Sequence, residues 1–270
     1  GVEAVAETLI EKGGNSSAQE QGHVLIANSL VKRYKGAAGP ALDNFNLQVH
    51  AGEFFGLLGA NGAGKTTAIS IFSGLFPPDS GTVSVLGIDF HQQPNKIKQM
   101  AGLVPQDIAL YDNLTGRENL LFFGRLYGLT GKKLQDRIEW CLDFSRLTDQ
   151  AADFVSTYSG GMKRRLNLAA GLLHIPHILF LDEPTVGIDA QSRHLIHGQL
   201  TELNKNGTTI IYTTHYMEEA QELCSRIGII DDGRIIEQGT PAGLLQQSGR
   251  RNLEDLFLHL TGRQLRDCQI

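Results

Sequence analysis

The stretch GANGAGKTT, residues 59–67, follows the apolar run FFGLL (54–58) and precedes AISIF (68–72). It fits the pattern G-x-x-x-x-G-K-[ST], and we expect a strand before it and a helix after it, the context that this pattern requires. Glycines let backbone N–H groups surround phosphate oxygens, and the helix dipole adds to the attraction. The stretch predicts a nucleotide-binding loop, with candidate contacts at Gly59, Asn61, Gly62, Ala63, Gly64, Lys65, Thr66 and Thr67.

A second segment, ILFLDEP (178–184), is an apolar run that ends in two carboxylates. Continuous apolar runs are typical of buried parallel strands, and ligands of open α/β sheets bind beyond the carboxyl ends of such strands. We expect Asp182 to reach a Mg²⁺ ion that Thr66 also contacts, and Glu183 to activate the attacking water. Two surface acids after a core strand are the alternative, which the phosphate loop upstream disfavours.

Composition excludes several classes of protein. The 270 residues carry 24 Lys and Arg against 29 Asp and Glu, a net charge of −5. The chain therefore lacks the overall basic charge that is typical of nucleic-acid-binding proteins. No run approaches the roughly 18 apolar residues of a membrane span, and the acidic first residues are unlike a secretory signal. The three cysteines are scattered, and we expect them to be reduced thiols. The 31 glycines are a larger share of the 270 residues than the roughly 7% that is typical of proteins.

Strand and helix patterns alternate along most of the chain, which predicts an α/β sheet. We expect a flexible extension over 1–22, a β-rich start from His23, and one strand over TVSVLGI (82–88). Residues 116–147 are mostly helical in pattern, with a break at Gly131, and interrupt the α/β alternation. The further expected strands are HILFLD, TTIIYTTH, RIGIID and GRIIEQG, and the further expected helices are GGMKRRLNLAAGLLH, 190–205, a helix from Met217, PAGLLQQ and LEDLFLHL.

The segment YSGGMKRR (158–165) lies between GANGAGKTT and ILFLDEP in the sequence and resembles the signature sequence of ABC transporters. With the other two motifs, it makes residues 23–245 resemble the ATP-binding cassette of that family. The resemblance implies a P-loop ATPase core of the α/β class with an N-terminal antiparallel β subdomain. It also implies an inserted α-helical subdomain over about 107–172 and a C-terminal helical tail over 246–270.

Further positions match the family in order along the chain. Tyr34 resembles the aromatic residue that stacks on adenine, Gln106 the glutamine of the Q-loop, Asp189 the aspartate of the D-loop, and His215 the switch histidine. A serine and two glycines at a helix start form a second anion site. The resemblance implies ATP contacts at Tyr34, Ser159, Gly160, Gly161 and Asp189, Mg²⁺ ligands at Thr66, Gln106 and Asp182, and catalytic roles for Lys65, Gln106, Glu183 and His215.

The resemblance also implies partners. Each ATP would lie between the phosphate loop of one cassette and the signature of another, in a head-to-tail homodimer or pair of cassettes. The transport path would belong to a separate transmembrane permease, which places this chain peripherally on the cytoplasmic face of the cell membrane. Tyr158 and Met162 depart from the usual L-S-G-G-Q, and Y-S-G-G-M-x-R-R-L is similar to the branch of drug, polysaccharide and nodulation-factor exporters.

Two other functions compete with transport. A non-transport cassette acting on DNA or ribosomes would carry long coiled coils after the Q-loop, or two cassettes on one chain, and neither pattern is present here. A P-loop kinase for small molecules would not need the signature or His215. Salt-sensitive nucleic-acid binding would favour the first alternative, and a phosphorylated product the second.

Overall fold

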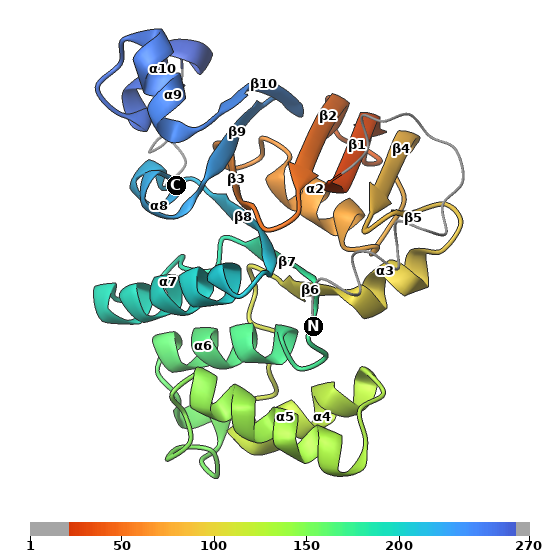
Figure 1. The fold of residues 1–270 in the computed structure, drawn as a ribbon, viewed down its shortest axis with the longest axis vertical. Helices are drawn as coiled ribbons and strands as arrows, with labels where there is room; N and C mark the ends of the chain where they lie inside the picture. Colours follow the sequence, from red (N-terminus) through yellow and green to blue (C-terminus); the bar gives the residue numbers. More distant parts are fainter. Residues whose placement is uncertain (1–21, 263–270) are drawn as a thin grey trace.

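A computed structural model of the chain describes residues 22–262, and within them the strands form two sheets (Figure 1). The larger sheet has the order β10-β9-β3-β8-β7-β6 and is parallel except for the β9–β10 pair. Its strands β3, β7 and β8 are buried along their whole length, which explains their continuous apolar sequences. The strands are β3 (Phe54–Leu58), β6 (Ala101–Val104), β7 (Ile178–Asp182), β8 (Thr209–Thr214), β9 (Arg226–Asp231) and β10 (Arg234–Gly239).

The smaller sheet is antiparallel and has the order β2-β1-β4-β5. It confirms the predicted N-terminal antiparallel β unit. The expectation of one strand over 82–88 is wrong, because the chain turns at Leu86 and Gly87, both with positive φ, between β4 and β5. The strands are β1 (His23–Lys32), β2 (Leu42–His50), β4 (Ser80–Val85) and β5 (Ile88–Asp89).

Three helices and a short 3₁₀ turn form a block at the end of the molecule away from β1 and β2 (Figure 1). They share their own apolar cluster, which includes Leu120, Ile138 and Leu166. The predicted break falls before Gly131 and not at it, because Gly131 begins the second helix. The elements are α4 (Gly116–Leu126), α5 (Gly131–Phe144), η1 (Val155–Thr157) and α6 (Gly160–Gly171).

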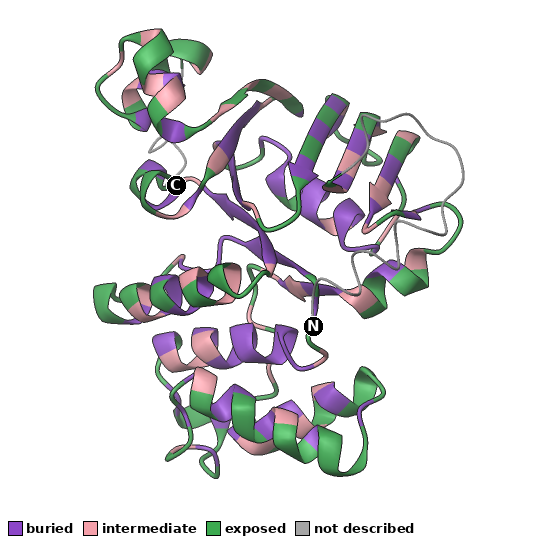
Figure 2. Cartoon of the chain, viewed as in Figure 1, coloured by how far each residue is buried: buried purple, intermediate pink, exposed green. Residues whose placement is uncertain are grey.

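Helices cover both faces of the parallel sheet, whose central strands are buried (Figure 2). Alternate side chains of β3 enter two separate cores. Phe55 and Leu57 pack with Phe72 on one side, whereas Phe54 and Leu58 pack on the other. The short helix α3 and the strand β6 are additions that the sequence patterns did not predict. The helices are α2 (Lys65–Phe72), α3 (Pro94–Met100), α7 (Ala190–Lys205), α8 (Met217–Leu223), α9 (Pro241–Ser248) and α10 (Leu253–Thr261).

Three sequence expectations concern the chain ends, the cysteines and the membrane. The predicted flexible extension lies outside the described residues except for its last position, Gly22. Cys141 and Cys224 are free and buried, and burial raises the pKa of the Cys141 thiol to about 12. No helix among the described residues has the length and apolar character needed to cross a bilayer.

Candidate active site

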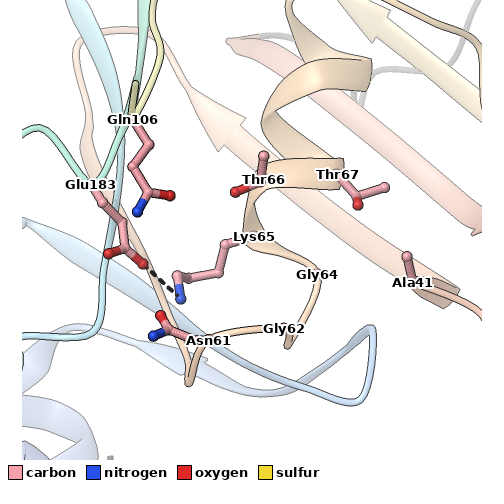
Figure 3. Close-up of a pocket in the computed structure, with 9 residues that line it drawn as sticks. All are labelled: Ala41, Asn61, Gly62, Gly64, Lys65, Thr66, Thr67, Gln106 and Glu183. Atoms are coloured by element: carbon pink, nitrogen blue, oxygen red, sulfur yellow. Dashed lines mark ion pairs between the residues drawn. The ribbon is translucent and has the colours of Figure 1, made fainter. Parts of the chain in front are cut away.

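The carboxyl ends of β3, β6, β7 and β8 meet at one edge of the sheet, and a cavity of about 350 Å³ opens there (Figure 3). Residues from the segment before β2, from the continuous loop after β3 and start of α2, and from the segments after β6 and β7 line it. Four separate segments of the sequence therefore contribute to one site. The lining residues are Ala41, Asn61, Gly62, Gly64, Lys65, Thr66, Thr67, Gln106 and Glu183.

Gly64 forms the turn from the loop into α2. Its φ is 111°, and a Cβ at this position would lie 2.4 Å from the carbonyl oxygen of Ala41, so a side chain is excluded both by conformation and by space. Gly64 offers no side-chain cap to the first N–H groups of α2. These groups, at the positive end of the helix, can bind an anion beside Lys65.

Lys65 is 4% exposed and its ammonium makes three polar contacts. It donates to the carbonyl oxygens of Gly59 at 2.7 Å and Ala60 at 3.0 Å. Its Nζ also lies 3.0 Å from Oε1 of Glu183. The loop carbonyls orient the side chain, and Glu183 neutralises its charge.

Glu183 has a φ of 45°, an uncommon conformation for a residue with a side chain. Strand β8 holds it there, since the Glu183 N–H lies 3.2 Å from the carbonyl oxygen and 3.0 Å from Oγ1 of Thr213. Its Oε2 lies 2.9 Å from Nδ1 of His215, which donates to the carboxylate. Burial raises the pKa of Glu183, but hydrogen bonds from His215 and the charge of Lys65 outweigh it, and the net pKa is lowered.

Asp182, Gln106 and Thr66 supply oxygen donors around the same edge. Asp182 is buried at the end of β7, and Oγ1 of Thr213 donates to its Oδ1 at 2.6 Å. Gln106 follows β6, and its side chain is directed toward Glu183 and Lys65 (Figure 3). Oxygen ligands of these kinds suit Mg²⁺. The described part of the chain holds no group of three or more His, Cys, Asp or Glu residues that could bind a metal ion.

Tyr34 lies at the margin of this site and is 44% exposed. Its hydroxyl is 3.2 Å from Oγ1 of Thr67 in α2, and its ring makes an edge contact with Phe76. The contact with Thr67 fixes the ring near the phosphate loop, and the exposure leaves ring surface free for an aromatic ligand.

The signature residues lie elsewhere, because none of Ser159, Gly160 and Gly161 lines the cavity. Ser159 caps α6 by accepting the N–H of Met162, as Asp189 caps α7. The two helix starts touch. A Cβ on Gly161 would lie 2.0 Å from Oγ of Ser192, whose hydroxyl donates to Asp189 at 2.9 Å.

The departure from leucine at position 158 has a structural explanation. Tyr158 belongs to the apolar cluster of the helical block, and its hydroxyl donates to the carbonyl oxygen of Gln150 at 2.6 Å. Met162 packs on the same cluster. Both side chains therefore anchor the start of α6, and neither substitution removes a backbone N–H group.

Several residues of the site were not singled out from the sequence. Ala41 lines the cavity, and Thr213 bonds both acids at the end of β7. Arg164, 7% exposed, donates to the carbonyl oxygens of Gln106 and Val186 and so joins α6 to the segments after β6 and β7. The available sequence signals were the place of Arg164 within YSGGMKRR (158–165) and that of Thr213 two residues before His215.

Comparisons with known proteins agree with this geometry. Residues 42–186 match the family described as ABC transporter. The chain is 52% identical over 226 residues to the linearmycin resistance ATP-binding protein LnrL of Bacillus subtilis, covering 84% of this chain and 72% of that protein. It is 46% identical over 206 residues to the Nod factor export ATP-binding protein I of Sinorhizobium fredii, covering 76% and 60% respectively.

A solved structure shares the fold. It is the dimeric ATP-binding cassette MJ0796 in a post-hydrolysis state bound to ADP and Pi, with a TM-score of 0.74 and 28% identity. The superposition covers 80% of this chain and 98% of that one.

Proposed function

The chain belongs to the ABC transporter family, and from this membership we propose that it hydrolyses ATP as the nucleotide-binding subunit of an exporter. The observation that carries the hydrolytic part is the pair of contacts by which the buried Glu183 joins Lys65 to His215. The names of two relatives, one for linearmycin resistance and one for Nod factor export, support the export direction. They agree with the branch that the signature sequence resembles.

Lys65 and the N–H groups at the start of α2 bind the terminal phosphates in this proposal. The lowered pKa keeps Glu183 ionised at neutral pH, so its carboxylate can accept a proton from the attacking water. His215, which contacts the same carboxylate, donates to Glu183 or to an oxygen of the γ-phosphate. The phosphate competes with Glu183 for Lys65, and this frees the carboxylate to orient the water.

Mg²⁺ fits the donor set of this edge. Thr66, Gln106 and Asp182 would hold the ion, which would neutralise charge on the phosphates. Two or three protein oxygens suffice, because Mg²⁺ keeps waters and substrate phosphates in the rest of its shell. Asp182 is kept in place by Thr213 whether it contacts the ion directly or through a water.

The nucleotide base would stack on Tyr34, while the signature would serve a second site. Ser159, Gly160 and Gly161 lie outside the cavity of their own chain, which supports binding to the nucleotide of another cassette. A head-to-tail pair would complete both sites. The dimeric cassette MJ0796 supports pairing. Asp189, in contact with the start of α6 through Ser192, would lie at that junction.

A separate transmembrane permease would supply the transport path, and it would bring the chain to the cytoplasmic face of the membrane. We expect it to dock near Gln106 and the helical block. Tyr111 and Phe122 support this location, because both are exposed there and lie in an edge contact of 4.9 Å between ring centroids. We assign residues 23–245 to the ATPase domain, 107–172 to its helical subdomain and 246–270 to the C-terminal tail.

Phosphate release from ATP by the purified chain tests the hydrolytic part of the proposal, with Glu183→Gln as the comparison. Co-purification with a membrane subunit from the native cell tests the transport part. A chain that hydrolyses ATP and instead binds nucleic acid in a salt-sensitive manner would favour the non-transport alternative.

A further inference from the structure

Glu219, on α8, is a buried carboxylate outside the cavity, and both of its oxygens accept hydrogen bonds from hydroxyl groups. It is 4% exposed. Oγ1 of Thr185 donates to Oε1 at 2.7 Å. The hydroxyl of Tyr212 and Oγ1 of Thr214 donate to Oε2, at 2.9 Å and 3.1 Å. Three hydroxyls on one buried carboxylate form a polar network within an otherwise apolar cluster.

The hydroxyls belong to the two segments that carry the reacting groups. Thr185 is two residues beyond Glu183, and Thr214 directly precedes His215. Glu219 thus joins the segment after β7 to the end of β8, immediately beside the 2.9 Å contact between Glu183 and His215. Shifting either segment would change that contact, because one segment carries Glu183 and the other carries His215.

Two basic side chains of α7 also lie near Glu219. Nε of Arg193 lies 3.5 Å and Nε2 of His197 lies 3.6 Å from Oε1 of Glu219. Burial raises the pKa of Glu219, but the interaction with His197 and the hydrogen bonds from Thr185 and Tyr212 outweigh it, and the net pKa is lowered. The carboxylate is therefore ionised at neutral pH and can accept from all three hydroxyls at once.

We propose that Glu219 is a positioning residue that fixes the spacing between Glu183 and His215 during ATP hydrolysis. The inference rests on the proposed function, since it concerns the same reaction. A glutamine has the same shape, but its amide nitrogen donates and cannot accept from a hydroxyl. In Glu219→Gln at least one of the three bonds must therefore reverse or break, and the two segments lose their common anchor.

The test compares three variants in the full chain: Glu219→Gln, Thr185→Val, which removes a single hydroxyl, and Glu218→Gln as the matched control. Glu218 is the exposed neighbour of Glu219 on the same helix. We expect kcat for ATP to fall about tenfold or more in Glu219→Gln and severalfold in Thr185→Val, with KM within about threefold of wild type. The control should keep both constants.

Unfolding temperatures and a double-mutant cycle separate positioning from a purely structural role. Since Glu219 acts on the Glu183–His215 spacing, the kcat cost of Glu219→Gln should shrink in a His215→Ala background. A lowered unfolding temperature with unchanged kcat would overturn the inference, as would a cost that stays the same in that background. If Glu219→Gln does not fold, an unchanged kcat in Thr185→Val overturns it.

The wild-type chain distinguishes a failure of this inference from a failure of the proposed function. Hydrolysis by wild type that Glu183→Gln abolishes, together with an unaffected Glu219→Gln, rejects only the positioning role. Absence of hydrolysis in wild type rejects both.

Discussion

The ammonium of Lys65 lies 3.0 Å from a carboxylate oxygen of Glu183, and both side chains are almost fully buried. The lysine belongs to the phosphate loop and the glutamate to the strand end 118 residues further along the chain (183 − 65). Because a bound phosphate needs the same ammonium, nucleotide binding and the release of Glu183 toward water are coupled. The first two predictions and the last depend on this pair.

Lys65→Met should lower the affinity for ATP about 100-fold, equivalent to ~2.7 kcal/mol, because the variant loses the charge that faces the phosphates. It also leaves Glu183 buried without the ammonium that neutralises its charge. Isothermal titration with ATP measures the affinity. Lys132→Met, at an exposed position of α5, is the control and should bind as wild type does. Equal affinities for ATP in the two variants would show that Lys65 does not contribute to nucleotide binding.

Glu183 predicts a pH dependence of stability whose sign follows from its lowered pKa. Its ordinary value is 4.5, and its value in the folded chain is lower. The ionised group therefore stabilises the fold above pH 4.5, and this contribution is lost as the pH falls through the folded value. The difference in unfolding temperature between wild type and Glu183→Gln should be largest near neutral pH and shrink below pH 4.5. A constant difference from pH 7 to pH 3 would contradict the ion pair.

Tyr34 should contribute its ring and not its hydroxyl to binding. Tyr34→Phe removes the contact with Thr67 but keeps the aromatic face, and we expect KM for ATP to stay within about threefold. Tyr34→Ala loses stacking worth ~1–3 kcal/mol, so KM should rise about tenfold or more. Steady-state kinetics of both variants decide between ring and hydroxyl. A larger rise in KM for Tyr34→Phe than for Tyr34→Ala would contradict the role of the ring.

Arg164 should not be replaceable by lysine. Its guanidinium donates to two carbonyl oxygens in different segments, whereas an ammonium at the end of a single stem cannot match this planar geometry. We expect Arg164→Lys to lower the free energy of unfolding by ~2 kcal/mol. It should also lower kcat, because Gln106 loses its anchor. Urea unfolding and kinetics test both effects, and unchanged values in both would show the bonds to be dispensable.

Much of the fold followed from local sequence. Continuous apolar runs predicted β3, β7 and β8, and the glycine pattern predicted the loop that Gly64 ends. The hairpin of β4 and β5 was missed because only Gly87 signals its turn, while Leu86, also at positive φ, is a residue typical of strands and helices. Strand β6 has only four residues, too short for a recognisable pattern.

The site was predictable where one segment carries the chemistry, and less so where distant segments meet. Sequence motifs predicted Lys65 and Glu183 separately, but not that they pair. Ala41 enters the site only because the loop before β2 packs against Gly64. Glu219 has no motif of its own, and its place beside Thr185 and Thr214 depends on how α8 packs on β8.

Hydrolysis and ATP binding by Glu183→Gln, measured side by side with wild type, test the central claim most directly. The variant should bind ATP at least as tightly, because Lys65 loses its charged competitor. Its hydrolysis should fall 100-fold or more, which corresponds to ~2.7 kcal/mol of barrier, and ATP should drive it into an accumulating dimer. Hydrolysis near the wild-type rate, with ATP binding intact, would contradict the assignment of Glu183 as the residue that activates water.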